Sequence, residues 1–458
     1  MAFPVVDFFS KNVYTENFKA FEAVYGMKKK PEEKDGKVAM ADNLFLDMRG
    51  YLIFGRVIGV IPLSGVFGLS HKSLRFKMLS VPVIVSLCIT LIVSLSTVMS
   101  LLHSIKSSKS NALEIARSVQ GFSFILWGFF CYIYFLLRAE SIINIFKTWE
   151  KSTLYHSVKD KTFPRDIILI STIVFVSATL ETTVNHMEYF PQFDGINGMS
   201  VKNASKYGSA LEAYYWRSNG HWGRHFGYHP LLAVLSFVSH KFVLFCWNYV
   251  DVLMIIFARA LYFKFKGLCQ IAVENLKSSK ESLKIRPMGI ADQLTWVQIV
   301  KDHDTLCNIL EAFEKFLSPL IFGSYTTNIY YICMQLIDGL TPDKIAHSVV
   351  HSIFTPWSFL HLTMRIFLLS VTAARINLYA HEIGNILKKC PIEFYDAEVA
   401  RVDKHVTAGP DIGLSGLGCF IVTKPFILSI VNVIFTVEIV LLQGLSSATG
   451  PCTASTKS

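Results

Sequence analysis

Seven long apolar stretches, separated by polar and charged segments, dominate the sequence. They cover Leu79–His103, Val119–Leu137, Asp166–Phe190, Leu231–Phe263, Ser318–Leu340, Val349–Thr372 and Ile421–Gln443. A stretch of about 19 residues or more, as an α-helix rising about 1.5 Å per residue, covers the roughly 30 Å of hydrocarbon in a bilayer. The pattern therefore predicts an all-α membrane protein with seven transmembrane helices.

An eighth apolar stretch, Tyr51–Leu69, is a weaker candidate because it contains Arg56, Pro62 and four glycines. We predict that it does not cross the bilayer, and that residues 1–78 form an N-terminal segment with an interfacial helix. No apolar core lies near the start of the chain, so we expect no cleavable signal peptide.

The composition supports this prediction. Of the 458 residues, 52% are hydrophobic and only 17% are charged, with a mean hydropathy of +0.41. Soluble domains carry about 25% charged residues, because charged side chains on the surface keep a folded domain soluble in water. A soluble enzyme, a disordered chain and a small disulfide-stapled module are therefore excluded.

The distribution of basic residues predicts the orientation. With seven spans, 31 Lys and Arg residues lie in 1–78, 138–165, 264–317 and 373–420, and nine lie in 104–118, 191–230, 341–348 and after 443. Because basic loops stay in the cytoplasm, the N-terminus is expected inside and the 444–458 tail outside. The net charge of +10 is then explained by loops that face an anionic leaflet, so we expect no nucleic-acid partner.

This topology divides the chain into alternating parts. Residues 79–263 hold the first four spans, 318–372 hold spans five and six, and 421–443 form the last span. Residues 264–317 and 373–420 are expected to be cytoplasmic. The sequon at Asn203 falls in the outer loop 191–230 and predicts glycosylation. Of nine cysteines only Cys452 lies outside, so no extracellular disulfide framework is expected.

Two charges lie inside the predicted spans at similar depth, Glu181 in the third and Lys241 in the fourth. A charge in a span is costly and faces protein or water, where it marks a site or a pathway. The two residues either form an ion pair that sets helix register, or Glu181 binds a polyol ligand.

Other polar and aromatic side chains lie within the second span and the fourth to sixth spans. The set comprises Trp127, Trp247-Asn248-Tyr249, Asp251, Tyr330-Tyr331, Gln335, Trp357 and His361. Such a mixture suits a sugar, whose C–H faces stack on aromatic rings and whose hydroxyls need donors and acceptors. A packed protein core would have the same composition, and both interpretations remain open.

Motifs for metal, nucleotide or catalytic chemistry are weak. His221, His225 and His229 have helical spacing, but three glycines interrupt them and argue against a helix; His347 and His351 repeat the spacing. We predict no metal site and no cofactor. The GLSGLG run at Gly413–Gly418 precedes a span and predicts a bend, not a nucleotide loop. Without a nucleophile–base constellation, no enzymatic activity is expected.

The last span carries a polar stripe. Thr436 and Gln443 are seven residues apart, and Asn432 and Ser429 lie on the same helical face. Such a stripe is unfavourable against lipid. It either lines a water-filled path in a symmetric oligomer or forms an ordinary helix–helix seam.

The Thr436-to-Gln443 pattern resembles the C-terminal signature of insect gustatory receptors, and Glu438 with Leu441-Leu442-Gln443 is similar to the sugar-receptor branch. The signature Tyr and Phe are replaced by Val437 and Gly444. Further matching positions follow in order along the chain: Ile61-Pro62-Leu63, Glu181, Trp247-Asn248-Tyr249, Asp251, Asn328, Tyr330, Gln335, Arg365 and Ala373-Ala374.

The resemblance implies a gustatory- and odorant-receptor-like tetrameric channel in the plasma membrane of taste neurons. It would be a sugar-gated, non-selective cation channel that passes monovalent and divalent cations. It would assemble as a homotetramer, or with other gustatory receptors. The implied ligand contacts are Glu181, Trp247, Asn248, Asp251, Tyr330, Gln335 and Trp357, and the implied pore residues are Thr436, Leu442 and Gln443. Since Gly444 replaces the signature Phe, the gate residue is not assigned.

A secondary transporter of a small polar solute is the rival interpretation. Transporters often show repeated halves with broken helices at matching positions. The sequence shows no such repeat, and an odd number of spans disfavours one.

The predicted orientation can be tested on the full chain. We expect an antibody to a C-terminal tag to label intact cells, and Asn203→Gln to remove a glycan-dependent mobility shift. An N-terminal tag on the same chain should need permeabilised cells. Labelling of the C-terminal tag only after permeabilisation would contradict the orientation.

Overall fold

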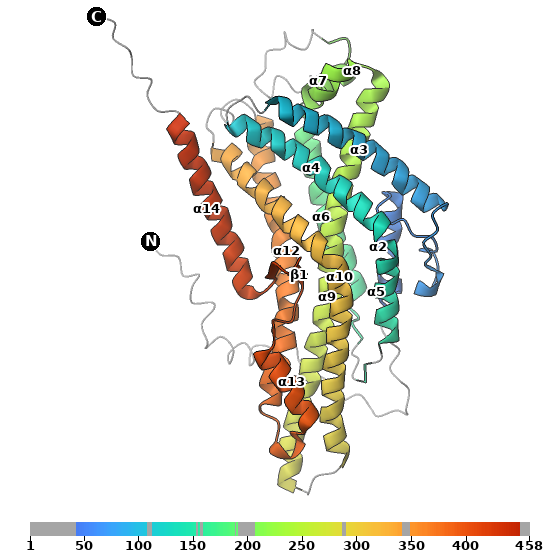
Figure 1. Cartoon of the computed structure of the whole chain (residues 1–458), viewed down its shortest axis with the longest axis vertical. Helices are drawn as coiled ribbons and strands as arrows, with labels where there is room; N and C mark the ends of the chain where they lie inside the picture. The colour runs from blue at the N-terminus through green and yellow to red at the C-terminus, as the bar shows by residue number, and fades with distance from the viewer. Residues whose placement is uncertain are drawn as a thin grey trace, which may run out of the picture. The chain divides into compact units, whose positions relative to one another are not determined.

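The computed structural model describes residues 43–107, 112–152, 154–155, 159–187, 189–190, 207–285, 290–340 and 349–448. These residues belong to one compact unit, Ala41–Ser458. Within it the chain is almost entirely helical (Figure 1).

The first half of the bundle consists of shorter helices: α2 (Leu44–Val57), α3 (Val81–Ser107), α4 (Ala112–Leu137), α5 (Ala139–Lys151), α6 (Phe163–Met187), α7 (Ala210–Ser218) and α8 (Gly220–Phe226). The second half consists of α9 (Pro230–Ile285), α10 (Ile290–Leu340), α12 (Val349–Leu387), α13 (Ala397–Ala408) and α14 (Lys424–Ala448). Short 3₁₀ turns, η2 (His71–Ser73) and η5 (Ile392–Phe394), and strands β1 (Ser415–Gly416) and β2 (Phe420–Ile421) connect them.

The all-α membrane fold predicted from the sequence is confirmed. Among the described residues, five helical stretches are long and apolar enough to cross a bilayer: Val81–Ile105, Ser118–Leu137, Phe163–Met187, Pro230–Ser279 and Val349–Leu387. The predicted fifth and seventh spans lie on α10 and α14, which are not among these five helical stretches. A count of seven crossings therefore stays a prediction.

The weak apolar stretch Tyr51–Leu69 is only partly helical. Helix α2 has 14 residues and ends at Val57. At about 1.5 Å per residue, it is too short for the roughly 30 Å of hydrocarbon. The helix packs its apolar side chains inward instead, with Leu44, Phe45 and Met48 buried.

Three helices are far longer than a membrane span. Helices α9, α10 and α12 have 56, 51 and 39 residues. The predicted boundaries at 263/264, 317/318 and 372/373 therefore fall inside continuous helices, and spans merge directly into the charged segments. Pro319 and Pro356 are accommodated within α10 and α12.

Below the apolar region in Figure 1, α13 packs against the lower parts of α10 and α12 with its Val399 and Val402 buried. His303 is buried there, and its Nε2 lies 3.1 Å from the carbonyl oxygen of Ala380. Burial disfavours the imidazolium and lowers the pKa of His303 to about 4, so this side chain is neutral at physiological pH.

The GLSGLG run forms a tight turn, as predicted. Strands β1 and β2 pair antiparallel, with Ser415 opposite Ile421. Leu417 and Gly418 both have positive φ angles, of 52° and 71°. Figure 1 shows α14 leaving this turn and diverging from the bundle along its side.

The histidine-containing segment near 220–229 contradicts one expectation. We predicted no helix there because of its glycines, but α8 spans Gly220–Phe226. Gly223 permits a close approach of Trp216, since a Cβ would lie 2.4 Å from that ring, and Gly227 ends the helix with φ +68°. Helices α7 and α8 pack on α9 and α3 through Tyr215, Trp222 and Met99.

Candidate functional site

Polar residues converge from four helices because each helix carries them on one face. On α9, Asn248 and Asp251 are three residues apart; on α12, His361 and Arg365 are four apart. Side chains at these spacings lie on the same side of a helix. Helix α10 adds Ser324, Asn328 and Gln335, and α6 adds Glu181.

The inner part of this polar network is organised by Arg365, whose side chain is 2% exposed. Its Nη1 donates to Asn248 Oδ1 at 3.0 Å and lies 3.3 Å from Asp251 Oδ2, and its Nη2 donates to Asn328 Oδ1 at 2.8 Å. Ser324 donates to the other carboxylate oxygen of Asp251 at 2.6 Å. The buried ion pair is therefore surrounded by hydrogen-bonding partners, as burial of charge requires.

The outer part of the network is organised by Glu181. The hydroxyl of Ser358 donates to Glu181 Oε1, and Gln335 Nε2 donates to that hydroxyl at 3.0 Å. His361 Nε2 lies 3.1 Å from Asn248 Oδ1 and 3.9 Å from Glu181 Oε2. His361 therefore joins the outer carboxylate to the inner arginine group.

An aromatic wall closes one side of the network. The guanidinium carbon of Arg365 lies 4.6 Å from the ring centre of Trp247. Trp247 in turn meets Tyr331 edge-on, with ring centres 5.0 Å apart, and Phe124 at 5.7 Å. A cation over a ring face and a T-shaped ring pair are both favourable geometries.

Three buried nitrogen atoms of this network have no hydrogen-bond partner within the described structure: Trp247 Nε1, His361 Nδ1 and Arg365 Nε. Buried polar groups are paired in the great majority of cases, and each exception requires an explanation. Unpaired nitrogen atoms of this kind can form hydrogen bonds with the hydroxyl groups of a small polar ligand.

The structure brings together five of the seven ligand contacts proposed from the sequence: Glu181, Trp247, Asn248, Asp251 and Gln335. Tyr330 lies apart, with its hydroxyl donating to the carbonyl of Ala116 on α4 at 2.7 Å. Trp357 is 37% exposed and donates to the carbonyl of Ser177 on α6.

The ion pair that the sequence offered for Glu181 is not formed in the structure, whereas its role as a ligand contact stays a prediction. Both Glu181 and Lys241 are described, and they do not pair: Lys241 contacts His186 and lies over the ring of Phe237 at 5.0 Å. Equal depth was a poor guide because the direction of the side chain decides the partner. Glu181 faces α12, whereas His186, five residues further along α6, faces α9.

Sequence reasoning placed His361 in the polar and aromatic set that suits a sugar but did not propose it as a ligand contact, and it assigned no site role to Arg365, Ser358 or Ser324. A usable signal existed for Arg365, because it is the only charged residue in the predicted span Val349–Thr372. A charge in that position marks a site or a pathway in a membrane protein. The two serines carry no such signal, since hydroxyl side chains are common in membrane helices.

The proposed pore residues lie on α14. Thr436 is exposed and its hydroxyl donates to the carbonyl of Asn432 at 2.8 Å, and Gln443 is exposed. The side chain of Leu442 and the sequon at Asn203 lie outside the described residues. Beyond the buried Ile430, exposed apolar residues such as Phe435 and Val440 show that α14 has little cover within this chain.

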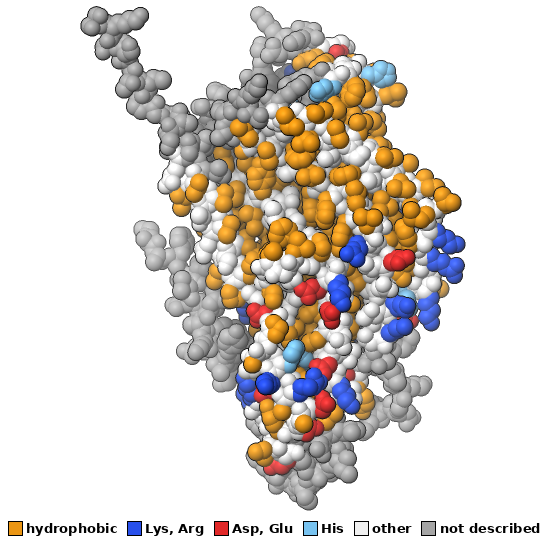
Figure 2. Space-filling model, viewed as in Figure 1, with side chains coloured by type: hydrophobic (Ala, Val, Ile, Leu, Met, Phe, Trp, Pro, Cys, Tyr) orange, Lys and Arg blue, Asp and Glu red, His pale blue; other side chains and the backbone are white. Residues whose placement is uncertain are grey.

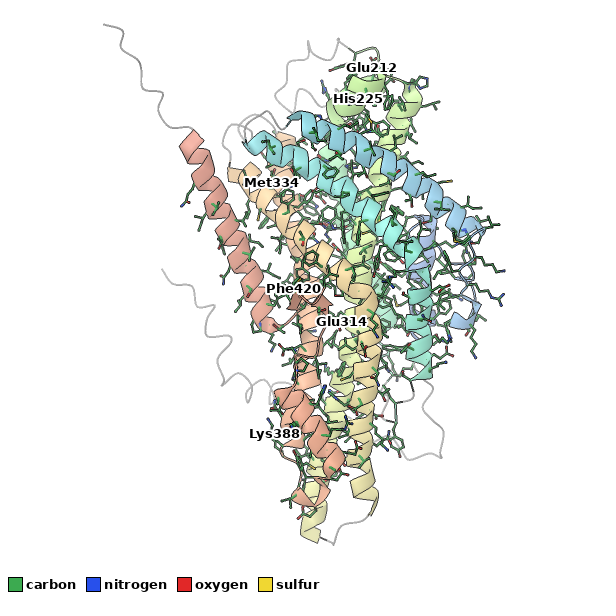
Figure 3. All side chains as sticks on the ribbon, viewed as in Figure 1. Glu212, His225, Glu314, Met334, Lys388 and Phe420 are labelled. Atoms are coloured by element: carbon green, nitrogen blue, oxygen red, sulfur yellow. The ribbon has the colours of Figure 1, made fainter. Side chains whose placement is uncertain are left out.

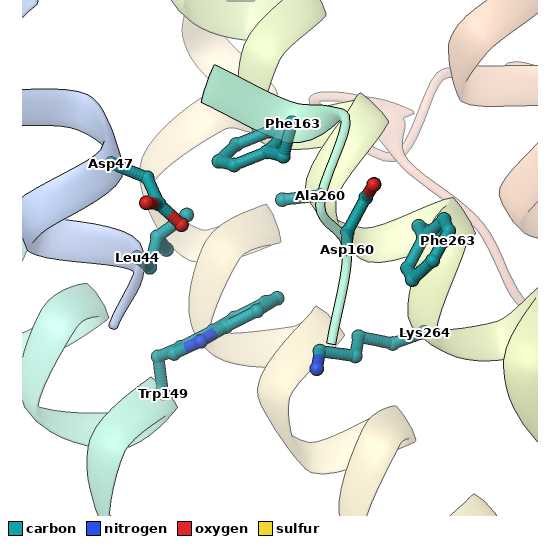
Figure 4. Close-up of a pocket in the computed structure, with 8 residues that line it drawn as sticks. All are labelled: Leu44, Asp47, Trp149, Asp160, Phe163, Ala260, Phe263 and Lys264. Atoms are coloured by element: carbon teal, nitrogen blue, oxygen red, sulfur yellow. The ribbon is translucent and has the colours of Figure 1, made fainter. Parts of the chain in front are cut away.

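A small pocket lies elsewhere, between α2, α5 and α9, where Asp47, Trp149 and Lys264 contribute to its lining (Figure 4). None of the proposed ligand contacts lines it. Within the described residues, no group of three or more His, Cys, Asp or Glu side chains is placed to hold a metal ion.

Comparison with known proteins supports a single family. The trehalose receptor family model matches residues 28–450. The Drosophila melanogaster gustatory receptor for sugar taste 64a is 21% identical over 403 residues, covering 86% of this chain and 82% of that receptor. The Drosophila melanogaster gustatory receptor 5a for trehalose is 25% identical over 218 residues, covering 48% and 46% of the two chains.

A solved structure supports the same fold. The insect olfactory receptor OR5 from Machilis hrabei superposes with a TM-score of 0.61 at 13% identity, covering 87% of this chain and 99% of that one. At this identity the likeness shows the fold alone. Since the family model spans most of the sequence, the chain belongs to the trehalose receptor family, in the sugar branch of the insect gustatory receptors.

Proposed function

We propose that this sugar-sensing receptor is a sugar-gated, non-selective cation channel that serves as a sweet-taste receptor in the plasma membrane of taste neurons. Relatives named for sugar taste and for trehalose support the ligand class. The observation that carries the proposal is the buried polar network, in which Trp247, His361 and Arg365 each keep one unpartnered nitrogen atom and the guanidinium of Arg365 lies over the ring of Trp247.

The network offers both kinds of chemistry that a sugar needs. The carboxylates of Glu181 and Asp251 accept hydrogen bonds from hydroxyls, while Arg365 and His361 supply nitrogen atoms. The ring of Trp247 can stack on a C–H face of the sugar if the sugar displaces the guanidinium of Arg365 from that ring. We therefore place the mono- or disaccharide between α6, α9, α10 and α12.

Binding there requires side chains to move, because the polar groups now bond to one another in a buried cluster. A ligand that replaces these bonds favours a different arrangement of the helices, which couples binding to gating. Full opening requires about 5.5 kcal/mol of differential binding, or about 1.4 kcal/mol from each of four sites. Weak affinity for sugar is therefore compatible with strong gating.

Helix α14 is the proposed pore helix. Its polar positions Ser429, Asn432 and Thr436 are exposed, as is Gln443 near its end. Four copies around an axis, from a homotetramer or with other gustatory receptors, would cover its apolar faces and direct the polar stripe, with Leu442, at a shared path. A ring of neutral side chains discriminates little among monovalent and divalent cations.

A direct route joins the network to the base of α14 (Figure 3, Phe420 labelled). Ser324, which bonds Asp251, is followed on α10 by Tyr325, whose hydroxyl lies 2.8 Å from that of Ser370 on α12. The Tyr325 ring meets Phe420 and Phe426 edge-on, at 5.6 and 5.4 Å, and those two rings stack at 4.4 Å. Movement of α10 and α12 around the network is thereby transmitted to the first turn of α14.

The first test is current in cells that express only this chain. We expect common mono- and disaccharides to evoke a cation current that is absent from untransfected cells. Silence at normal surface expression, alone and with other gustatory receptors, would contradict the proposal. Sugar flux without channel-like conductance would favour the transporter instead.

Glu181→Gln tests the ligand site. The amide can still accept from Ser358, but it loses the charge-assisted hydrogen bond to a sugar hydroxyl, which contributes about 1.5–3 kcal/mol. We expect the half-maximal sugar concentration to rise about 10- to 100-fold, with the maximal current recovered at high sugar. The control Glu311→Gln removes an exposed carboxylate that pairs with Lys315, and should leave the curve unchanged. Equal shifts in both variants would exclude Glu181 as a ligand contact.

Tyr325→Phe tests the coupling route, because it removes only the hydroxyl that meets Ser370. One neutral hydrogen bond contributes about 1 kcal/mol, so the open–closed equilibrium should change about fivefold. We expect a lower maximal current that more sugar does not restore. Tyr134→Phe is the control, since it removes a hydroxyl of α4 that donates to the carbonyl of Phe316 on α10 and so deletes one hydrogen bond to the same helix without touching Ser370. A loss in the control as large as in Tyr325→Phe would contradict a specific coupling role.

A further inference from the structure

The segment of residues 58–80, between α2 and the start of α3, combines exposed apolar side chains with a concentration of positive charge. Leu79, Leu69 and Phe67 are 91%, 75% and 62% exposed. Lys72, Arg75 and Lys77 are exposed beside them in the sequence, and the segment contains no Asp or Glu.

This surface is built on an ordered framework. Ser64 and Arg75 form a backbone bridge, and the hydroxyl of Ser73 donates to the carbonyl of Gly65 at 2.6 Å. On the inner side Val60, Ile61, Leu63, Val66 and Leu74 are buried in the main core. His71 contacts Glu150 of α5, which ties the segment to that helix. The exposed side chains therefore project from a fixed base.

The position of the segment relates it to the bilayer. Residue 80 directly precedes α3, whose first turns expose Val81, Ile84 and Val85 to the outside. The apolar surface of the segment therefore continues into the apolar surface of a membrane-spanning helix. In Figure 2, hydrophobic side chains cover the upper part of the molecule, and Lys and Arg gather below them at the right edge.

Each kind of side chain points to a different part of a lipid. Apolar side chains at the edge of a span insert at the boundary of headgroups and acyl chains, and basic side chains next to a span attract anionic headgroups by about 1 kcal/mol each. Because the segment has no carboxylate, its own charges leave that attraction uncompensated. We propose that residues 58–80 form a binding surface for anionic phospholipids, with Phe67 and Leu69 inserted and Lys72, Arg75 and Lys77 on the headgroups.

The test uses the purified full chain with the photocrosslinker p-benzoylphenylalanine in place of Phe67, in nanodiscs of phosphatidylcholine and phosphatidylserine. Both leaflets have the same composition, so the result is independent of orientation and of sugar gating. We expect phosphatidylserine to be enriched among the lipid adducts at least about fivefold relative to its share of the nanodisc lipid. This is the factor that the attraction of one basic side chain supplies. Adducts in proportion to the lipid mixture, or adducts to a peptide segment of this or another chain, would overturn the proposal.

Two triple variants test whether the basic side chains of residues 58–80 cause the enrichment. In the triple variant K72Q/R75Q/K77Q, phosphatidylserine should form adducts only in proportion to its share of the lipid. The control K388Q/K389Q/K404Q removes three exposed charges elsewhere and should retain the enrichment. The same photocrosslinker in place of Leu91, an exposed residue within α3, should yield lipid adducts in every variant and so report a folded, inserted chain. Equal loss of enrichment in both triple variants would also overturn the proposal.

Discussion

The ion pair between Arg365 and Asp251 is the constraint around which this bundle is arranged. Both side chains are almost fully buried, and they lie 3.3 Å apart. An isolated charge in such a place is strongly unfavourable, and loss of one partner of a buried pair costs about 3–5 kcal/mol. Asn248 and Asn328 accept hydrogen bonds from the two terminal nitrogens of the guanidinium, so α9, α10 and α12 must meet in one register for this arrangement to exist.

In the function that we propose, the same ion pair would make the site respond to a ligand. A buried pair adds little net stability but specifies one arrangement of helices, and a ligand that competes for its hydrogen bonds favours another. The unpartnered nitrogens of Trp247, His361 and Arg365 show that the present arrangement leaves hydrogen-bonding capacity unused. Polar ligand recognition and helix movement can therefore share one set of side chains.

Packing differs along the molecule in a way that suits such a device. The lower parts of α9, α10 and α12 hold a dense core with Phe257, Phe313 and Trp296 fully buried, whereas α14 is covered only near its base. Elements with few buried contacts move at low free-energy cost. Helix α14 is therefore the part of this bundle that can change position at the lowest free-energy cost.

The sequence by itself determined the class of fold, because twenty-residue apolar stretches and basic loops have one physical use in a chain of this composition. The resemblance to the family came from particular residues instead, above all the pattern from Thr436 to Gln443. The sequence also singled out Glu181, Trp247, Asn248, Asp251 and Gln335, which the structure brings together in one network, since polar residues in apolar spans stand out. Only the tertiary structure decided their partners. Glu181 turned to Ser358 instead of Lys241, Tyr330 turned to α4, and Arg365 became the centre, because helix rotation and crossing, which local patterns do not encode, set the direction of each side chain.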